Sequence, residues 1–128
     1  MVLADCDPVA FVATTDLARA RQFYEGDLGL RLVAETPIAC VFDAHGTTLR
    51  VTAVTEIYVA PHTVLGWTVP DIASVVRALA GRGVGFQRYN GMAQDDLGVW
   101  RTPGGDQVAW FSDPDGNTLS VTQLNDRA

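Results

Sequence analysis

The side chains that could bind a metal ion are few in this chain and widely spaced. The two histidines, His45 in DAHGTT and His62 in APHTVL, occupy turn-like contexts, and their separation does not match that of paired metal ligands. The two cysteines, Cys6 and Cys40, are too few and too isolated for a zinc site or a disulfide framework. We therefore expect surface histidines and free thiols.

Other catalytic arrangements are also missing from the sequence. All nine basic residues are arginines, so no lysine can form a Schiff base. Asp95 and Asp96 are adjacent and would point to opposite sides of a strand, so we place them in a solvated loop rather than in a carboxylate pair. The glycines around positions 81–85 indicate a helix end, not a dinucleotide fingerprint, and no nucleophile elbow is present.

The composition describes a compact acidic protein. With 128 residues, 48% hydrophobic and 19% charged, the chain is predicted to be one globular domain spanning 1–128. A net charge of −6 without a basic cluster repels nucleic acid and anionic lipid. The apolar runs are far shorter than the roughly 20 residues of a membrane span, and MVLADCDP is unlike a signal peptide. We expect a cytoplasmic protein that binds neither nucleic acid nor membranes.

An internal repeat predicts the elements that must position any site. VAFVATTDLARARQFY (9–24) and VLGWTVPDIASVVRAL (64–79) each combine a short apolar strand with an aspartate, Asp16 or Asp71, placed to cap a helix. Apolar residues at helical spacing follow each aspartate. Gly29 and Gly83 then provide the flexible backbone on which helices commonly end. Each repeat therefore begins as strand and helix.

Extended segments punctuated by glycine and proline follow each predicted helix. They lie near 30–34, 38–42 and 47–54 in the first half, and near 84–89, 106–112 and 117–123 in the second, with a short added strand near 97–101. Residues 55–63 join the halves. The predicted fold is α+β, with two βαβββ repeats (about 9–54 and 64–124) forming a curved mixed sheet around a cup-shaped cavity, helices on its outer face.

The paired repeats, the segment TTDLARARQFYEGDLGL and the turn FSDPDGNTLSV together resemble the vicinal oxygen chelate superfamily, over about 9–124. That superfamily includes glyoxalase I, the extradiol dioxygenases and the bleomycin resistance proteins. In its metal-dependent members, histidines or glutamates from four strands hold a divalent ion. The resemblance places those positions at Val9, Arg50, Val64 and Ser120, where no ordinary metal ligand stands. We therefore expect a member without a metal or any other cofactor.

The strands around the DPDG turn are predicted to pair so that one face meets the cup. In that pairing Phe111, Thr118 and Ser120 face the cup, whereas Trp67 and Trp110 pack against the helices.

Arginine and aromatic side chains are the other candidates for ligand contact. Arg50 needs either a salt bridge with one of the 15 acids or an anionic or carbonyl-rich ligand. Phe86, Tyr89 and Trp100 surround a long connection and could stack on a flat ligand or pack beneath that connection. The predicted ligand-binding residues are Phe11, Arg50, Thr52, Phe86, Trp100, Phe111 and Ser120.

Three functions are compatible with these residues. The first is a metal-free protein that binds a small hydrophobic or aromatic molecule, as the drug-sequestering relatives do. The second is a metal-dependent lyase, isomerase or dioxygenase with non-standard ligands such as Asp43, His45, Glu56 or His62. The third is a dimerisation or regulatory module. The resemblance implies a homodimer in all three cases.

Overall fold

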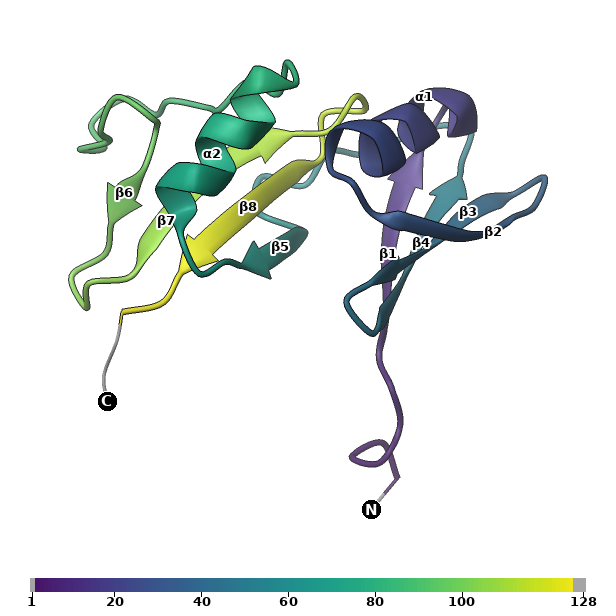
Figure 1. The fold of residues 1–128 in the computed structure, drawn as a ribbon. Helices are drawn as coiled ribbons and strands as arrows, with labels where there is room; N and C mark the ends of the chain where they lie inside the picture. Colours follow the sequence, from purple (N-terminus) through teal and green to yellow (C-terminus); the bar gives the residue numbers. More distant parts are fainter. Residues whose placement is uncertain (1, 126–128) are drawn as a thin grey trace. The chain divides into compact units, whose positions relative to one another are not determined.

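A computed structural model describes residues 2–125 of the chain, which divide into two compact units (Figure 1). The first unit extends to Tyr58 and the second begins at Val59, so the boundary falls inside the predicted connection 55–63. Each unit contains one of the two predicted repeats. Within the part of the chain that the structure describes, no helix is both long and apolar enough to cross a membrane.

The first unit is a four-stranded sheet with a helical segment packed against β3 and β4 (Figure 1). Its strand order is β1-β4-β3-β2, in which β1 is parallel to β4 and the other pairs are antiparallel. Tyr24, Phe42, Leu49 and Val51 form the centre of its core, all almost fully buried. The elements are β1 (Val9–Thr14), α1 (Leu17–Arg21), η1 (Gln22–Asp27), β2 (Arg31–Glu35), β3 (Ala39–Ala44) and β4 (Thr47–Ala53).

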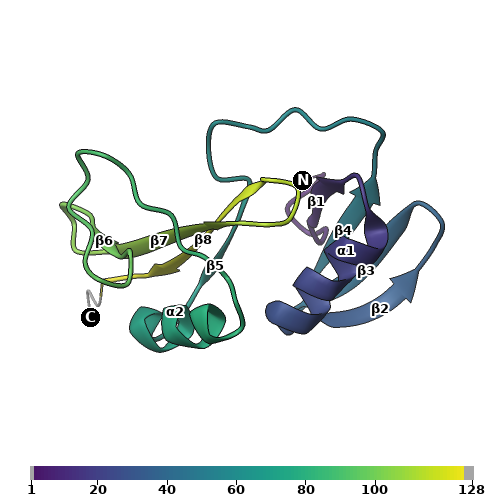
Figure 2. The same ribbon diagram turned by 90° about the horizontal axis from the view of Figure 1, so that it is seen from above.

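The second unit repeats this plan with strand order β5-β8-β7-β6, and one helix packs against β7 and β8 (Figure 2). Its core combines Ile72 and Val76 of the helix with Phe111 and Leu119 of the sheet. The two helices and two mixed sheets confirm the predicted α+β class, whereas the cup stays a prediction. The elements are β5 (Leu65–Thr68), α2 (Ile72–Gly81), β6 (Trp100–Arg101), β7 (Gln107–Ser112) and β8 (Thr118–Gln123).

Both helices begin and end where the sequence predicts. The side chain of Asp16 caps α1, and that of Asp71 caps α2 by accepting the Ser74 backbone N–H at 3.2 Å. This bond, together with one from the Ser74 hydroxyl, lowers the pKa of the Asp71 carboxyl. Gly29 and Gly83 follow the helices with φ of 77° and 90°, a conformation in which a side chain would be strained.

Residues 84–89, all described by the structure, do not form the predicted strand. Only an isolated bridge between Phe86 and Phe111 remains of it. The side-chain amide of Gln94 takes the place of a neighbouring strand, because its Nε2 donates to the Gln87 carbonyl at 2.9 Å and its Oε1 accepts the Tyr89 N–H at 2.7 Å. The predicted short strand near 97–101 is present as β6, paired with β7.

The β7–β8 hairpin has a register one residue away from the predicted one. Ser112 pairs with Thr118, so the turn consists of residues 113–117. Asp113, which is only 5% exposed, closes this turn by accepting the backbone N–H of Asn117 at 2.9 Å and its side-chain N–H at 2.8 Å. The Asp115 N–H donates to the same carboxylate at 3.0 Å. The carboxylate therefore fixes how many residues the turn contains.

The shift exchanges the two faces of β7 relative to β8, because side chains alternate along a strand. Phe111 is fully buried on the helix-covered face, and Trp110 pairs with Ser120 on the opposite, open face. The predictions that Phe111 faces the cup and that Trp110 packs against the helix are therefore wrong. Trp67 lies on the helix-covered face as predicted, with its ring stacked on Phe111 at 6.4 Å.

Replacing the Asp113 carboxylate should destabilise the protein. Asp113→Ala removes the acceptor that the carboxylate provides to the backbone N–H and the side-chain N–H of Asn117, and the loss of such a buried hydrogen bond costs about 1–3 kcal/mol. Urea unfolding should show a loss of this size for Asp113→Ala and a smaller one for Asp113→Asn, which keeps one acceptor. Pro114→Ala, an exposed change in the same turn, is the control. Equal midpoints for all three variants would contradict this account of the turn.

Candidate functional site

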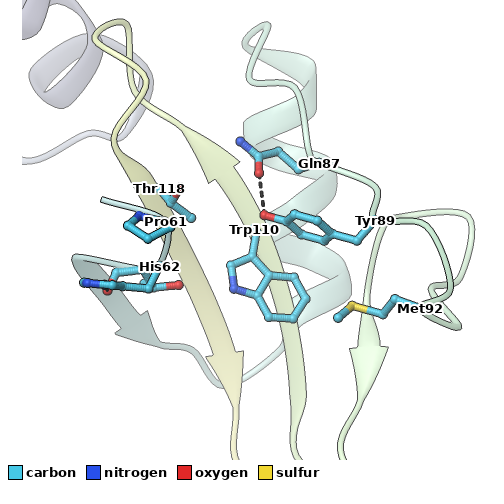
Figure 3. A pocket seen from close by; sticks show the side chains of 8 residues that line it. Pro61, His62, Gln87, Tyr89, Met92, Trp110 and Thr118 are labelled. Carbon is cyan, nitrogen blue, oxygen red and sulfur yellow. Dashed lines mark hydrogen bonds between the residues drawn. The ribbon is translucent and has the colours of Figure 1, made fainter. Parts of the chain in front are cut away.

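The open face of the second sheet carries a hollow of about 500 Å³ (Figure 3). Trp110 of β7 and the first residue of β8, Thr118, form part of its wall. The remaining residues come from the segment before β5 and from the connection between α2 and β6. The lining residues are Pro61, His62, Thr63, Gln87, Tyr89, Met92, Trp110 and Thr118.

Aromatic rings dominate this hollow. The half-buried indole of Trp110 stands in its middle (Figure 3), and the ring of Tyr89 meets it edge-on, with centroids 5.5 Å apart and planes at 88°. Trp100 lies beside Trp110 on the neighbouring strand β6, with ring centroids 6.2 Å apart. Tyr89 is 39% exposed. These rings offer an apolar surface against which a planar molecule can stack.

Gln87 holds the Tyr89 ring in this position. Its side-chain N–H donates to the Ser112 hydroxyl, and its side-chain carbonyl accepts the Tyr89 hydroxyl proton (Figure 3). Gln94 fixes the backbone of the same segment, and its Nε2 also donates to the Gly98 carbonyl at 2.8 Å. Both glutamine amides are thus bonded to the protein itself, which makes the connection 87–99 a fixed wall of the hollow.

The hollow also presents polar groups for a ligand. His62 Nδ1 lies 3.1 Å from the Thr63 carbonyl oxygen, which can only accept, so Nδ1 carries the proton and Nε2 is the acceptor of the neutral ring. The Trp110 indole N–H has no hydrogen-bond partner among residues 2–125. Its nitrogen is turned toward the side where Pro61 and His62 lie (Figure 3). One donor and one acceptor therefore stand beside the stacking surface.

The predicted ligand-binding residues of the first unit lie together. Phe11, Arg50 and Thr52 line a separate hollow of about 430 Å³ on the open face of the first sheet. Phe11 is 64% exposed there. Arg50 is half-buried, and in the described part of the chain it forms no salt bridge with any acid. Of the two alternatives for Arg50, the salt bridge is thus not found.

The predicted residues of the second unit divide between the two faces of the sheet. Trp100 and Ser120 lie on the open face, but Phe86 packs against the buried Phe111 on the other, with ring centroids 5.3 Å apart. Ser120 is only 8% exposed, and a Cβ on Gly66 would come within 2.7 Å of its hydroxyl oxygen. Phe111 and Ser120 thus have little surface to offer, and the ligand-binding role of all four stays a prediction.

Several lining residues were missed or misplaced by the sequence reasoning. Trp110 was assigned to the wrong face, although the pair of polar residues that begins and ends DPDGN could have indicated a turn of residues 113–117. Gln87 and Met92 had no local signal, because their position depends on the path of the connection between α2 and β6.

The positions that correspond to metal ligands do not fit a divalent cation. In the first unit, Val9 and Arg50 share the open face, and in the second, Val64 and Ser120 do. Alkyl groups, a hydroxyl and a guanidinium cannot replace the hydration shell of such an ion. Within residues 2–125 no group of three or more histidine, cysteine, aspartate or glutamate side chains is placed to hold a metal ion.

Comparison with known proteins identifies relatives of the whole chain. The family model described as "Glyoxalase/Bleomycin resistance protein/Dioxygenase superfamily" matches residues 6–121. No protein of curated function matches the sequence.

Several solved structures share the fold. A glyoxalase/bleomycin resistance protein/dioxygenase from Alicyclobacillus acidocaldarius is 20% identical, with 98% of this chain and 96% of that chain covered and a TM-score of 0.70. A member of the same superfamily from Sphaerobacter thermophilus DSM 20745 is 21% identical, with 92% and 96% covered and a TM-score of 0.72. A lactoylglutathione lyase from Agrobacterium tumefaciens is 17% identical, with 93% of each chain covered and a TM-score of 0.70.

Removing the Gln94 amide should loosen the wall of the hollow. Gln94→Ala deletes hydrogen bonds to Gln87, Tyr89 and Gly98, each worth about 0.5–1.5 kcal/mol. We expect the Tyr89 amide to exchange its hydrogen about tenfold faster or more, because local opening becomes less costly. Gln107→Ala, a change on β7, is the control. Unchanged exchange at Tyr89 would show that the segment is held by other contacts.

Proposed function

Since the chain belongs to the glyoxalase/bleomycin resistance protein/dioxygenase superfamily, we propose that it binds a planar hydrophobic or aromatic molecule without a metal ion. The site is the hollow around Trp110, and the protein sequesters its ligand rather than transforming it. The observation that carries this proposal is the accessible indole of Trp110, framed by Tyr89 and Met92 on the open face of the second sheet. Burial of these rings against a ligand supplies most of the binding free energy.

The size of the hollow supports a ligand of moderate mass. Its volume of about 500 Å³ lies within the range of roughly 300–1,000 Å³ that is usual for small-molecule sites. A ring stacked on Trp110 also reaches the edge of Tyr89 and the thioether of Met92, which adapts to the outline of an aromatic molecule. These contacts are tolerant of ligand shape, as a sequestering protein requires.

The polar groups of the hollow indicate which charge and which hydrogen-bonding groups the ligand can have. None of the eight lining residues is an aspartate, glutamate or arginine, so a ligand with a formal charge would lose hydration without gaining an ion pair. The Trp110 N–H can donate to a ligand carbonyl, and His62 Nε2 can accept from a ligand hydroxyl or N–H. An uncharged aromatic compound with such groups on one edge is the best fit.

The same residues argue for binding rather than catalysis. His62 is the only histidine among the lining residues, and none of the other lining residues supplies a carboxylate or thiol to act with it. A lyase, isomerase or dioxygenase of this superfamily would need ligands for its metal, and the corresponding positions lack them. A homodimer and a cytoplasmic location remain predictions from the sequence.

Titration of tryptophan fluorescence with planar aromatic natural products and antibiotics, and with indole as a minimal probe, tests this proposal. A Trp67→Phe background removes the tryptophan on the helix-covered face and leaves Trp100 and Trp110 as reporters. We expect at least one uncharged aromatic compound to change the emission. In this background Trp110→Leu should weaken its binding about tenfold or more, equivalent to about 1.4 kcal/mol, because the stacking surface is lost.

Two results would count against the proposal. The first is the absence of any fluorescence change across the panel, with Trp110 covered by protein in a crystal structure. The second is a stoichiometric divalent metal in untagged protein measured by elemental analysis, which would favour the enzymatic alternative. Ligand binding that survives Trp110→Leu but is lost in Phe86→Ala would move the site to the other face of the sheet.

A further inference from the structure

We propose a second binding site, for a small carboxylate-bearing molecule, on the open face of the first sheet and centred on Arg50. This site lies in the first unit and does not depend on the hollow around Trp110 in the second unit, which we call the aromatic hollow. Three independent features of the first unit support it: a guanidinium without a partner, a hydroxyl without a partner, and an exposed aromatic ring beside them.

The sheet register places Arg50 in the middle of this face. On β4 it pairs with Phe11 of β1 on one side and with Val41 of β3 on the other, so the three side chains share a face. The hollow of about 430 Å³ at this point is lined by Phe11, Val12, Ala13, Arg50 and Thr52. Apart from Arg50 and Thr52 the lining is apolar.

The guanidinium of Arg50 differs from those of Arg21 and Arg31, two other arginines of the first unit. Arg21 is bonded to Glu25 and Glu35, at 3.1 and 2.9 Å, and Arg31 lies 3.5 Å from Asp43. Arg50 is half-buried, yet among residues 2–125 its side chain has neither an ion pair nor a hydrogen bond.

The carboxylate on the same face of the sheet as Arg50 is bonded to other groups. Asp43 lies on the same face of β3, but it accepts the Gly46 N–H at 2.9 Å and is paired with Arg31. A partly desolvated guanidinium without an acceptor is unfavourable, so an acceptor supplied by a ligand would stabilise it.

Thr52 supplies the second unused polar group. It stands two residues after Arg50 on the same face of β4, and its hydroxyl oxygen is buried without any hydrogen-bond partner in the described structure. Rotation of this side chain to another staggered rotamer would let the hydroxyl meet a ligand oxygen. One carboxylate could then accept from both Arg50 and Thr52.

These groups define the class of ligand. A planar guanidinium pairs with a carboxylate through two parallel hydrogen bonds, and the 64% exposed ring of Phe11 covers an apolar or aromatic body attached to it. The chain carries a net charge of −6, which repels anions at long range. Binding must therefore come from direct contact with Arg50, and a lysine should be a poor substitute.

Calorimetric titration of the full chain carrying Trp110→Leu, which removes the stacking surface of the hollow around Trp110, with benzoate and with benzamide near neutral pH tests this site. Benzamide matches benzoate in shape but lacks the charge, so we expect benzoate to bind and benzamide to bind at least about tenfold more weakly. Arg50→Gln should reduce benzoate affinity by a similar factor, and Arg50→Lys should recover only part of it. Arg77→Gln, an exposed change on α2 of the other unit, is the matched control and should leave the affinity unchanged.

Other variants separate this site from the aromatic hollow and from general anion binding. Trp110→Leu should not affect benzoate, so failure of either site can be recognised independently of the other. Phe11→Ala should weaken benzoate more than acetate, because only benzoate uses the ring.

Four results would overturn the proposal: equal binding of benzoate and benzamide, unchanged affinity in Arg50→Gln, inorganic phosphate binding as tightly as benzoate, or a crystal structure with Arg50 paired to a carboxylate of the protein itself. If Arg50→Gln fails to fold, the comparison of benzoate with benzamide on the Trp110→Leu protein still decides.

Discussion

The buried carboxylate of Asp113 is the constraint on which the described site depends. It accepts hydrogen bonds from the backbone N–H and the side-chain N–H of Asn117. These bonds close the turn between β7 and β8 and set Ser112 opposite Thr118. A strand exposes alternate side chains on each face, so this choice decides that Trp110 is on the open face and Phe111 beneath the helix. A local polar interaction thus determines which aromatic surface the second unit presents to a ligand.

The wall of the aromatic hollow is likewise held by polar contacts rather than by a regular strand. Gln94 supplies from its side chain the hydrogen bonds that a neighbouring strand would supply from its backbone, and Gln87 anchors Tyr89 to Ser112. The connection between α2 and β6 can therefore leave the edge of the sheet while backbone N–H and C=O groups of this segment still form hydrogen bonds. The same connection then carries Tyr89 and Met92 over the open face, a common use of loops on a rigid sheet.

The two units use one architecture for different chemistry. In the second, the open face is aromatic and uncharged, which suits a neutral planar molecule. In the first, the corresponding face carries Arg50, an unpaired cation among apolar neighbours, which suits an anion. Relatives that hold a metal ion would need acidic or imidazole donors at positions occupied here by Val9, Arg50, Val64 and Ser120.

The sequence by itself determined the α+β repeats, the helix boundaries and most strands, because these depend on local signals. Asp16 and Asp71 cap helices, Gly29 and Gly83 end them, and apolar periodicity marks the buried faces. Only the tertiary structure decided the hairpin register, the loss of the strand at 84–89 and the absence of a salt bridge to Arg50 within the described residues. Each of these depends on contacts between groups distant in sequence or on a single hydrogen-bonded turn, and periodicity carries no information about either.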